Sequence, residues 1–97
     1  MTRVIFLDPA EEEMIEAASY YQDQAVGLGE HFVAEVQHAV ERIAENPMSG
    51  RIIKGETRRR LLRRFPFGIL YRIEAEEIVI VAVMHLRRRP GYWSDRT

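Results

Sequence analysis

Arginine is concentrated in two triplets, and the second lies beside residues that could bind or cleave a phosphate. The first triplet consists of Arg58, Arg59 and Arg60, and the second of Arg87, Arg88 and Arg89. The second is preceded by His85 and followed by Tyr92 and Trp93. Guanidinium groups bind phosphates and carboxylates, imidazole and phenol can transfer protons, and aromatic rings can stack on bases. Residues 85–93 are therefore the first candidate site, and a solvated basic tail is the simpler alternative.

Acidic and basic side chains are unevenly divided along the 97 residues. Residues 1–50 contain ten acidic and two basic side chains, whereas residues 51–97 contain five acidic and twelve basic ones, so that −8 and +7 sum to the net charge of −1. The second half should therefore present a cationic surface to a polyanion or an acidic peptide. The acidic face of the first half is interpreted more simply as a solvated surface that offsets this charge.

Length and composition suit one domain, residues 1–97, and a cytoplasmic location. The chain is 46% hydrophobic and has no cysteine, which excludes disulfides and thiolate metal sites. The apolar run at residues 4–7 is shorter than the roughly 7–15 residues of a secretory signal, and no run approaches the roughly 18 residues of a membrane-spanning helix. His31 and His38 would lie roughly 10 Å apart along a helix, too far to share a metal ion. We expect no metal, no cofactor and no membrane contact.

The first half of the chain reads as a strand followed by two amphipathic helices. Residues 3–7 form the predicted strand, and Asp8 is expected to cap a helix that has Pro9 at its first position. The apolar spacing of this helix leaves residues 11–13 largely on its outer face. A second helix follows Gly27 and ends at Asn46-Pro47, so the two helices should form an antiparallel hairpin.

From Ser49 onward the periodicity changes to that of β-strands. Residues 61–65, 69–73 and 78–84 are β-prone runs separated by turn signals, which predicts a three-strand antiparallel meander. The last run is almost wholly apolar, so we expect it inside the sheet and beside the N-terminal strand. The predicted fold class is α+β, a helical hairpin packed on a mainly antiparallel four-strand sheet, with residues 90–97 as a loosely held tail.

Tight turns in this meander would also fix which residues meet. They pair Phe67 with Met84 and Arg64 with Ile69. One end of the sheet is then expected to collect the basic residues Arg63, Arg64, His85, Arg87, Arg88 and Arg89. The first triplet is expected nearer the opposite end, as a solvent-facing edge that discourages aggregation.

Three segments resemble the RelE/ParE superfamily of small toxins from bacterial type II toxin–antitoxin modules. They are Asn46-Pro47, residues 64–73 and residues 82–93, and the resemblance covers almost the whole chain. It implies a toxin neutralised by a cognate antitoxin, ParD-like or related, whose amphipathic and partly disordered segment wraps the toxin. Members divide between poisons of DNA gyrase and ribosome-dependent mRNA endonucleases, so the target must be argued from the site. Operator binding usually belongs to the antitoxin, and we expect no sequence-specific DNA binding here.

The resemblance also supplies the residues of a metal-independent endoribonuclease, which needs proton transfer and stabilisation of a phosphorane. Its candidates here are His85, Arg87, Arg88, Tyr92, Arg63 and Arg72. That branch usually has an arginine where this chain has Phe67-Gly68, whereas a histidine directly after the last strand resembles the ParE branch. We therefore favour a ParE-like protein that inhibits gyrase by binding and is not an enzyme. An mRNA endonuclease and a non-toxic antitoxin-binding module are the alternatives.

The residues of the expected binding surface each have a structural interpretation as well. For contact with the target or the antitoxin we select Arg63, Arg64, Arg87, Arg88, Arg89, Tyr92 and Trp93. The two aromatic residues could instead anchor the tail to the sheet. His85 could bond a nearby backbone carbonyl without doing chemistry, Tyr71 is expected in the core or a groove wall, and Arg72 could pair with a helix glutamate.

Overall fold

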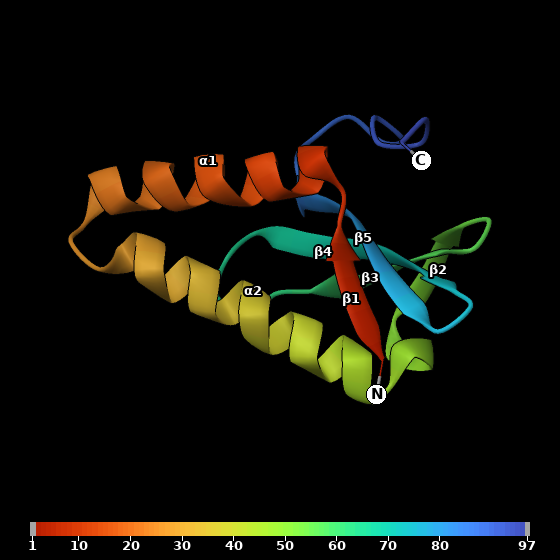
Figure 1. The fold of residues 1–97 in the computed structure, drawn as a ribbon. Helices are drawn as coiled ribbons and strands as arrows, with labels where there is room; N and C mark the ends of the chain where they lie inside the picture. The colour runs from red at the N-terminus through yellow and green to blue at the C-terminus, as the bar shows by residue number, and fades with distance from the viewer. Residues whose placement is uncertain (1, 97) are drawn as a thin grey trace.

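The computed structural model describes residues 2–96, in which two α-helices pack on a five-stranded sheet (Figure 1). The elements in chain order are β1 (Arg3–Phe6), α1 (Asp8–Gln24), α2 (Leu28–Glu45), the 3-10 helix η1 (Pro47–Ser49), β2 (Arg51–Lys54), β3 (Thr57–Leu61), β4 (Phe67–Glu74) and β5 (Glu77–His85). The predicted order of a strand, a helical hairpin and antiparallel strands is confirmed. Strand β2 was not predicted and makes the sheet one strand wider.

Strand order in the sheet is β1-β5-β4-β3-β2. β1 runs parallel to β5, with Phe6 beside Ile80, and the other neighbouring strands are antiparallel. β5 thus has β1 on one side and β4 on the other, and apolar cores cover both of its faces, so its residues from Ile78 to Met84 are all buried. The prediction that this apolar run pairs with the N-terminal strand is confirmed.

The strand before β4 lies four residues earlier in the chain than predicted, at β3 and not at residues 61–65. Leu61 is opposite Gly68, so the pairing of Arg64 with Ile69 is wrong. Residues 62–66 form a connection instead, in which Leu62 and Phe65 are buried in the helix-side core. Their apolar side chains close the end of the core, and that burial made the segment resemble a strand.

A β-bulge in β5 changes the pairing with β4 by one residue. The predicted register holds from the Glu74–Glu77 pair as far as Tyr71 and Ile80. Beyond that point Val81 is an extra residue, and Phe67 lies opposite His85 and not Met84. The bulge therefore brings His85, at the end of β5, level with the first residue of β4.

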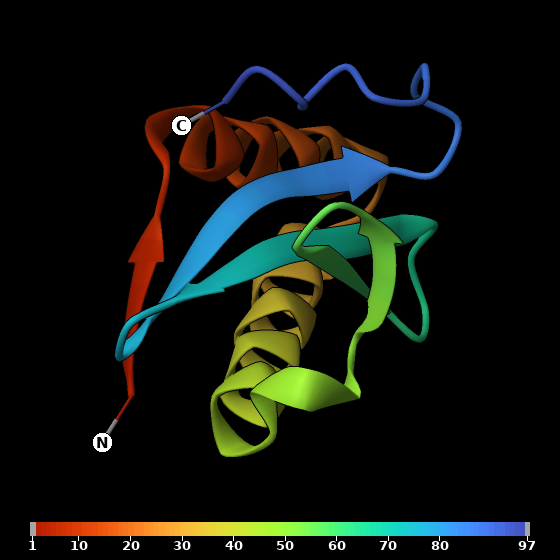
Figure 2. The same ribbon diagram turned by 90° about the vertical axis from the view of Figure 1, so that its right-hand side faces the viewer.

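Each face of the sheet has an apolar core. The larger core lies between the sheet and the helices and includes Phe32 of α2 and Tyr71 of β4, both fully buried. The smaller core, on the other face, includes Leu70, Val81, Ala82, Met84 and Trp93. Trp93 comes from the tail, which turns back after β5 and runs toward the start of α1 (Figure 2).

The start of α1 differs from the prediction in one detail. Leu7 and not Asp8 precedes the first helical residue, and its carbonyl oxygen accepts a hydrogen bond from the Glu11 amide at 3.1 Å. No side chain caps this end, and Pro9 lies in the first turn as predicted. Asp8 is the first residue of the helix, where its negative charge suits the helix dipole.

Neither a membrane-spanning helix nor a metal-binding cluster is found in the described part of the chain. Within residues 2–96, no helix has the length and apolarity needed to cross a membrane. The same residues contain no group of three or more His, Asp or Glu side chains that could hold a metal ion.

Candidate partner-binding surface

The tail that follows β5 is folded through a series of turns and held against the body. The Leu86 amide donates to the Pro66 carbonyl at 2.9 Å, which ties the start of the tail to the connection before β4. Gly91 has a φ of 76°, a left-handed conformation that glycine adopts without strain. Trp93, only 6% exposed, lies in the smaller core and anchors the tail to the sheet. Within residues 90–97, which the sequence suggested to be loosely held, residues 91–96 thus have definite contacts, and residue 97 lies outside the described residues.

Arg87, Arg88 and Arg89 of the second triplet are exposed where the chain leaves β5. The guanidinium carbon of Arg88 lies 4.0 Å from the centre of the Tyr92 ring, a cation–π contact. Among residues 2–96, the three side chains form no hydrogen bond and no ion pair. Their charges are therefore available to a partner.

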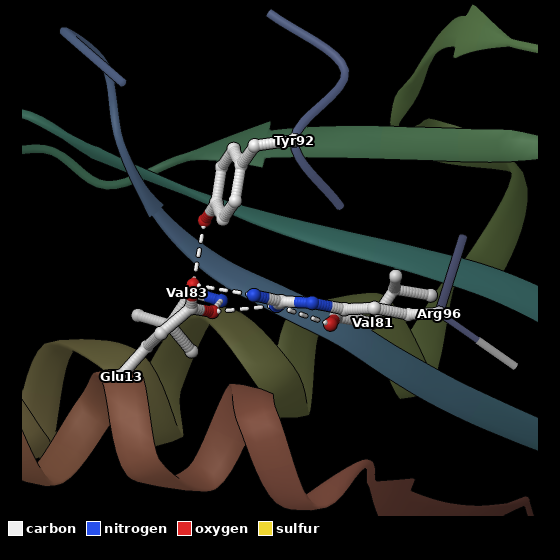
Figure 3. Close-up of polar contacts among 5 residues, drawn as sticks. All are labelled: Glu13, Val81, Val83, Tyr92 and Arg96. Carbon is white, nitrogen blue, oxygen red and sulfur yellow. Dashed lines mark hydrogen bonds and ion pairs between the residues drawn. The ribbon is translucent and has the colours of Figure 1, made fainter. Parts of the chain in front are cut away.

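The Glu13 carboxylate of α1 holds the end of the tail. The apolar spacing of the helix had predicted this residue on the outer face. The side chain of Glu13 is only 15% exposed and forms a two-pronged ion pair with Arg96, with N–O distances of 2.9 and 3.0 Å. It also accepts a hydrogen bond from the Tyr92 hydroxyl at 2.7 Å (Figure 3). We call Glu13, Tyr92 and Arg96 the tail clasp.

The tail clasp also satisfies backbone groups of β5 that no strand reaches. The pairing of β1 with β5 ends at Phe6 and Ile80, so one edge of β5 is unpaired beyond this point. The Val83 amide donates to Glu13 at 3.0 Å, and the Val81 carbonyl accepts from Arg96 at 3.1 Å (Figure 3). Buried backbone groups need hydrogen-bond partners, and the clasp supplies them to the second half of β5 as β1 does to the first half.

Burial and the contact with Glu13 keep the Tyr92 phenol protonated by raising its pKa. Burial raises the pKa of Tyr92 well above its ordinary value, and the hydrogen bond to Glu13 and the charge of Glu13 raise it further, against a lowering effect of Arg96 and Arg88. The pKa of Arg96 is also raised, first by its hydrogen bond to Glu13. The clasp thus contains one negative charge, one positive charge and a neutral phenol that donates.

His85 lies at the end of β5 in a groove of about 350 Å³ between α1 and the sheet, which Arg88 also lines. Its Nδ1 accepts a hydrogen bond from the Arg87 amide at 3.0 Å, and its ring packs on Phe67 with the ring centres 5.0 Å apart. In the neutral ring the proton is then on Nε2, so the open nitrogen is a donor and not a base. The ring is thus held by a backbone group, as in the structural interpretation of this histidine, but the partner is an amide and not the expected carbonyl.

Arg63 and Arg64 are exposed on the connection before β4 and line a different groove from Arg88. Their backbone amides donate to Glu35 of α2 at 3.1 and 3.3 Å. Both line a larger groove of about 1300 Å³ along α2, whereas the groove beside Arg88 is lined by α1. The hydrogen bond from Leu86 to Pro66 joins the two regions.

The candidates for a ribonuclease site are not brought together. Arg72 forms an ion pair with Glu74, two residues along the same strand, and not with a helix glutamate. It also donates a hydrogen bond to the Arg96 carbonyl at 3.5 Å. It lies five residues along β4 from Phe67, the residue opposite His85, which corresponds to roughly 16 Å at about 3.3 Å per residue. The Tyr92 hydroxyl is bound by Glu13, so only His85 and Arg88 share a groove.

The first triplet has a structural role and is not at the sheet edge, because β2 lies outside β3. Arg58 donates to the carbonyls of Met48 and Gly50 at 3.0 and 2.8 Å, and Arg60 donates to the Ser49 hydroxyl at 3.2 Å. All three arginines are half-buried. The expectation of a solvent-facing edge was therefore wrong, since the β2 strand that covers β3 had not been predicted.

A family model described as the ParE toxin of the type II toxin–antitoxin system parDE matches residues 4–90. The chain belongs to the ParE toxin family. Among solved structures, a chain of the "Chromosomal ParDE TA system from P. aeruginosa" has a TM-score of 0.66 and 23% sequence identity over 88% of this chain and 96% of that chain. This likeness shows a shared fold. No curated protein sequence matches the chain.

Family membership confirms the resemblance to the ParE branch and separates two parts of the candidate surface. Glu13 and the second triplet lie within the residues that the ParE family model matches, whereas Tyr92, Trp93 and Arg96 lie beyond its end at residue 90. The triplet is recognisable in the sequence from its charge, and the aromatic residues from their type. Glu13 and Arg96 are not recognisable, because their role depends on a buried ion pair between residues 83 positions apart.

Proposed function

We propose that this ParE-family protein inhibits growth by binding DNA gyrase and that a cognate antitoxin neutralises it. The observation that carries the proposal is the presentation of the second triplet. Its three guanidinium groups are exposed and have no hydrogen-bonded partner within residues 2–96, yet they lie on a tail that is fixed at both ends. A fixed cationic surface loses little conformational entropy when an acidic surface docks on it.

The contacts of the catalytic candidates support binding over RNA cleavage. The open nitrogen of His85 is a donor, and the phenol of Tyr92 has a raised pKa and donates to Glu13, so neither group is set up to take a proton from a ribose hydroxyl. Arg72 lies far along the strand and is paired with Glu74. A protein that acts by occupying a surface of its target needs none of these groups as catalysts.

We further propose that the antitoxin occupies the larger groove along α2. Arg60, Arg63 and Arg64 line this groove from β3 and the connection after it, whereas α2 contributes Glu35, Glu41 and Glu45, and apolar residues such as Leu28, Ala39 and Leu62 also line it. An amphipathic acidic segment would place its apolar side chains in the groove and its carboxylates against the arginines. The related P. aeruginosa structure is of a ParDE system, which supports a partner of this kind. The hydrogen bond from Leu86 to Pro66 brings this groove next to the second triplet, so the bound antitoxin would block the target.

The test is controlled expression in bacteria with separate readouts of replication and protein synthesis, followed by supercoiling assays on purified gyrase. We expect DNA breaks, filamentation and gyrase inhibition, with no ribosome-dependent RNA cleavage. The triple variant R87A/R88A/R89A should lose inhibition. The matched control R3A/R51A/K54A removes the same charge from three exposed positions elsewhere and should keep it. Arrested translation with cleaved mRNA, or full activity of the first variant, would contradict the proposal.

A further inference from the structure

We propose that Glu13 is a positioning residue for the second triplet: through the tail clasp it sets where Arg88 is presented to the partner. This inference rests on the proposed function, because it takes the triplet to be the surface that binds the target. It adds a residue of α1, more than 70 positions away in the sequence, that acts without contacting the target.

Glu13 is the centre of the polar contacts that hold the tail beyond Pro90. In the described chain, these contacts are the hydrogen bonds of Tyr92 and Arg96 to Glu13, that of Arg96 to the Val81 carbonyl, and that of Arg72 to the Arg96 carbonyl. Glu13 takes part directly in the shortest of them. Because the Glu13 and Arg96 side chains are only 15% and 16% exposed, their ion pair is poorly screened by water and salt.

The effect of Glu13 reaches the triplet through the Tyr92 ring. The hydroxyl of Tyr92 is fixed by Glu13 at 2.7 Å, which sets the position and the plane of the ring. The guanidinium group of Arg88 lies over this ring at 4.0 Å and forms no hydrogen bond within residues 2–96. The place of its guanidinium group is therefore set by a ring whose own place is set by Glu13.

Arg96 has a second part in the same arrangement, because it balances the charge of Glu13. Glu13 and Arg88 line the same groove, so an unpaired carboxylate would draw the Arg88 guanidinium inward and away from the partner. The two-pronged pair with Arg96 occupies both carboxylate oxygens and leaves Arg88 facing outward. The variant R96A should therefore weaken target binding although Arg96 itself lies off the exposed triplet.

The single tryptophan of the chain makes the clasp directly measurable. Trp93 is the only tryptophan, it is 6% exposed, and it lies between Tyr92 and Arg96 in the sequence. In E13A we expect Trp93 emission to move to longer wavelength and acrylamide quenching to rise about twofold, while the helices and the cooperative unfolding transition persist. E13Q, which keeps the acceptor oxygen and the size of the side chain, should show a smaller change. E12A is the matched control, an exposed glutamate one position earlier on α1, and should leave Trp93 unchanged.

A double-mutant cycle separates positioning from a merely structural role. If Arg88 depends on the clasp, E13A and R88A should each weaken gyrase inhibition by about 5-fold, and the double variant should be about 5-fold weaker and not about 25-fold. Additive losses, or an E13A protein with a released Trp93 and full inhibition, would overturn the inference. So would an unchanged Trp93 signal in E13A.

Different results would contradict the proposed gyrase target and the positioning role of Glu13. If the wild-type protein leaves gyrase unaffected, the proposed target is wrong, and the same cycle is then measured on growth inhibition in cells. The Trp93 measurement requires no target and tests the clasp in either case. Should E13A not fold, E13Q and R96A carry the cycle, and failure of both to couple with R88A would overturn the positioning role.

Discussion

The two arginine triplets have the same composition and opposite surroundings. The first lies in β3 between two strands, where Arg58 reaches the carbonyls of Met48 and Gly50. The second follows the last strand and lies in turns, where its side chains meet no acceptor within residues 2–96. The difference shows that the availability of an arginine run for binding is decided by the carbonyl and carboxylate groups within reach and not by its charge.

The contrast extends to what holds each triplet in place. In the first, Arg58 and Arg60 form hydrogen bonds to the segment around η1, so their charges stabilise the fold. In the second, Arg88 packs on the ring of Tyr92, which the tail clasp holds in place. This contact uses no acceptor group, so the charge of the triplet remains free.

The largest expected effect comes from the second triplet. R87A/R88A/R89A should weaken gyrase inhibition by about 100-fold, since three interface arginines that contribute about 1 kcal/mol each account for that loss. Its melting temperature should change by less than about 4 °C, because exposed side chains without partners contribute little to stability. Inhibition assays and thermal unfolding of the same preparation check both statements. A large loss of stability would show that the second triplet is structural like the first.

The first triplet should show the reverse behaviour. R58A removes two hydrogen bonds from a charged donor to backbone carbonyls and should lower the free energy of unfolding by about 1–2 kcal/mol. Inhibition per folded molecule should stay the same. Urea titration of R58A beside R59A, whose guanidinium forms no hydrogen bond in the described chain, gives the matched comparison. Equal stability of the two variants would remove the structural role of Arg58.

A smaller effect separates charge from planar stacking at Arg88. R88K keeps the positive charge and loses the flat guanidinium that packs on the Tyr92 ring, so inhibition should fall by about threefold, less than in R88A. The same exchange at the exposed Arg51 serves as the control and should have no effect. Identical inhibition by R88K and wild type would mean that only the charge of Arg88 matters.

The smallest effect is a dependence of stability on alkaline pH. The pKa of Tyr92 is raised in the folded protein, so its contribution is complete below the unfolded-state pKa of about 10 and is lost as the pH rises toward the folded value. Tyr21, whose pKa is also raised by burial and by Tyr20, adds a loss of the same sign. Urea midpoints between pH of about 9 and about 11 should fall less steeply in Y92F than in wild type. A slope unchanged by Y92F would indicate that the clasp does not hold the phenol protonated.

The sequence predicts the elements whose apolar period is long or uninterrupted. Both helices, the β5 run and its pairing with β1 follow from such periods. β2 is only four residues long and has a basic residue at each end, so its signal is weak. β3 contains three consecutive arginines, a pattern that hides a strand, while the buried Leu62 and Phe65 of the next connection imitate one.

The site was predictable only where its residues act through their own exposed charge. Arg87, Arg88 and Arg89 could be selected from their spacing beside aromatic residues. Glu13 could not, because it is one of three consecutive glutamates and differs from the others only in facing the unpaired edge of β5. That edge exists because β1 ends at Phe6, just before Asp8-Pro9 begins the helix, but its exact groups depend on the bulge at Val81, which has no local signal.

The pairing of Glu13 with Arg96 also has a consequence for how the protein is made. Translation adds roughly 5–20 residues per second, so several seconds pass between the synthesis of the two partners. During that interval the nascent chain has neither the finished β5 edge nor the anchored triplet. A product that lacks residue 96 would therefore leave Glu13 without its ion-pair partner, and the second triplet would lose the support of the tail clasp.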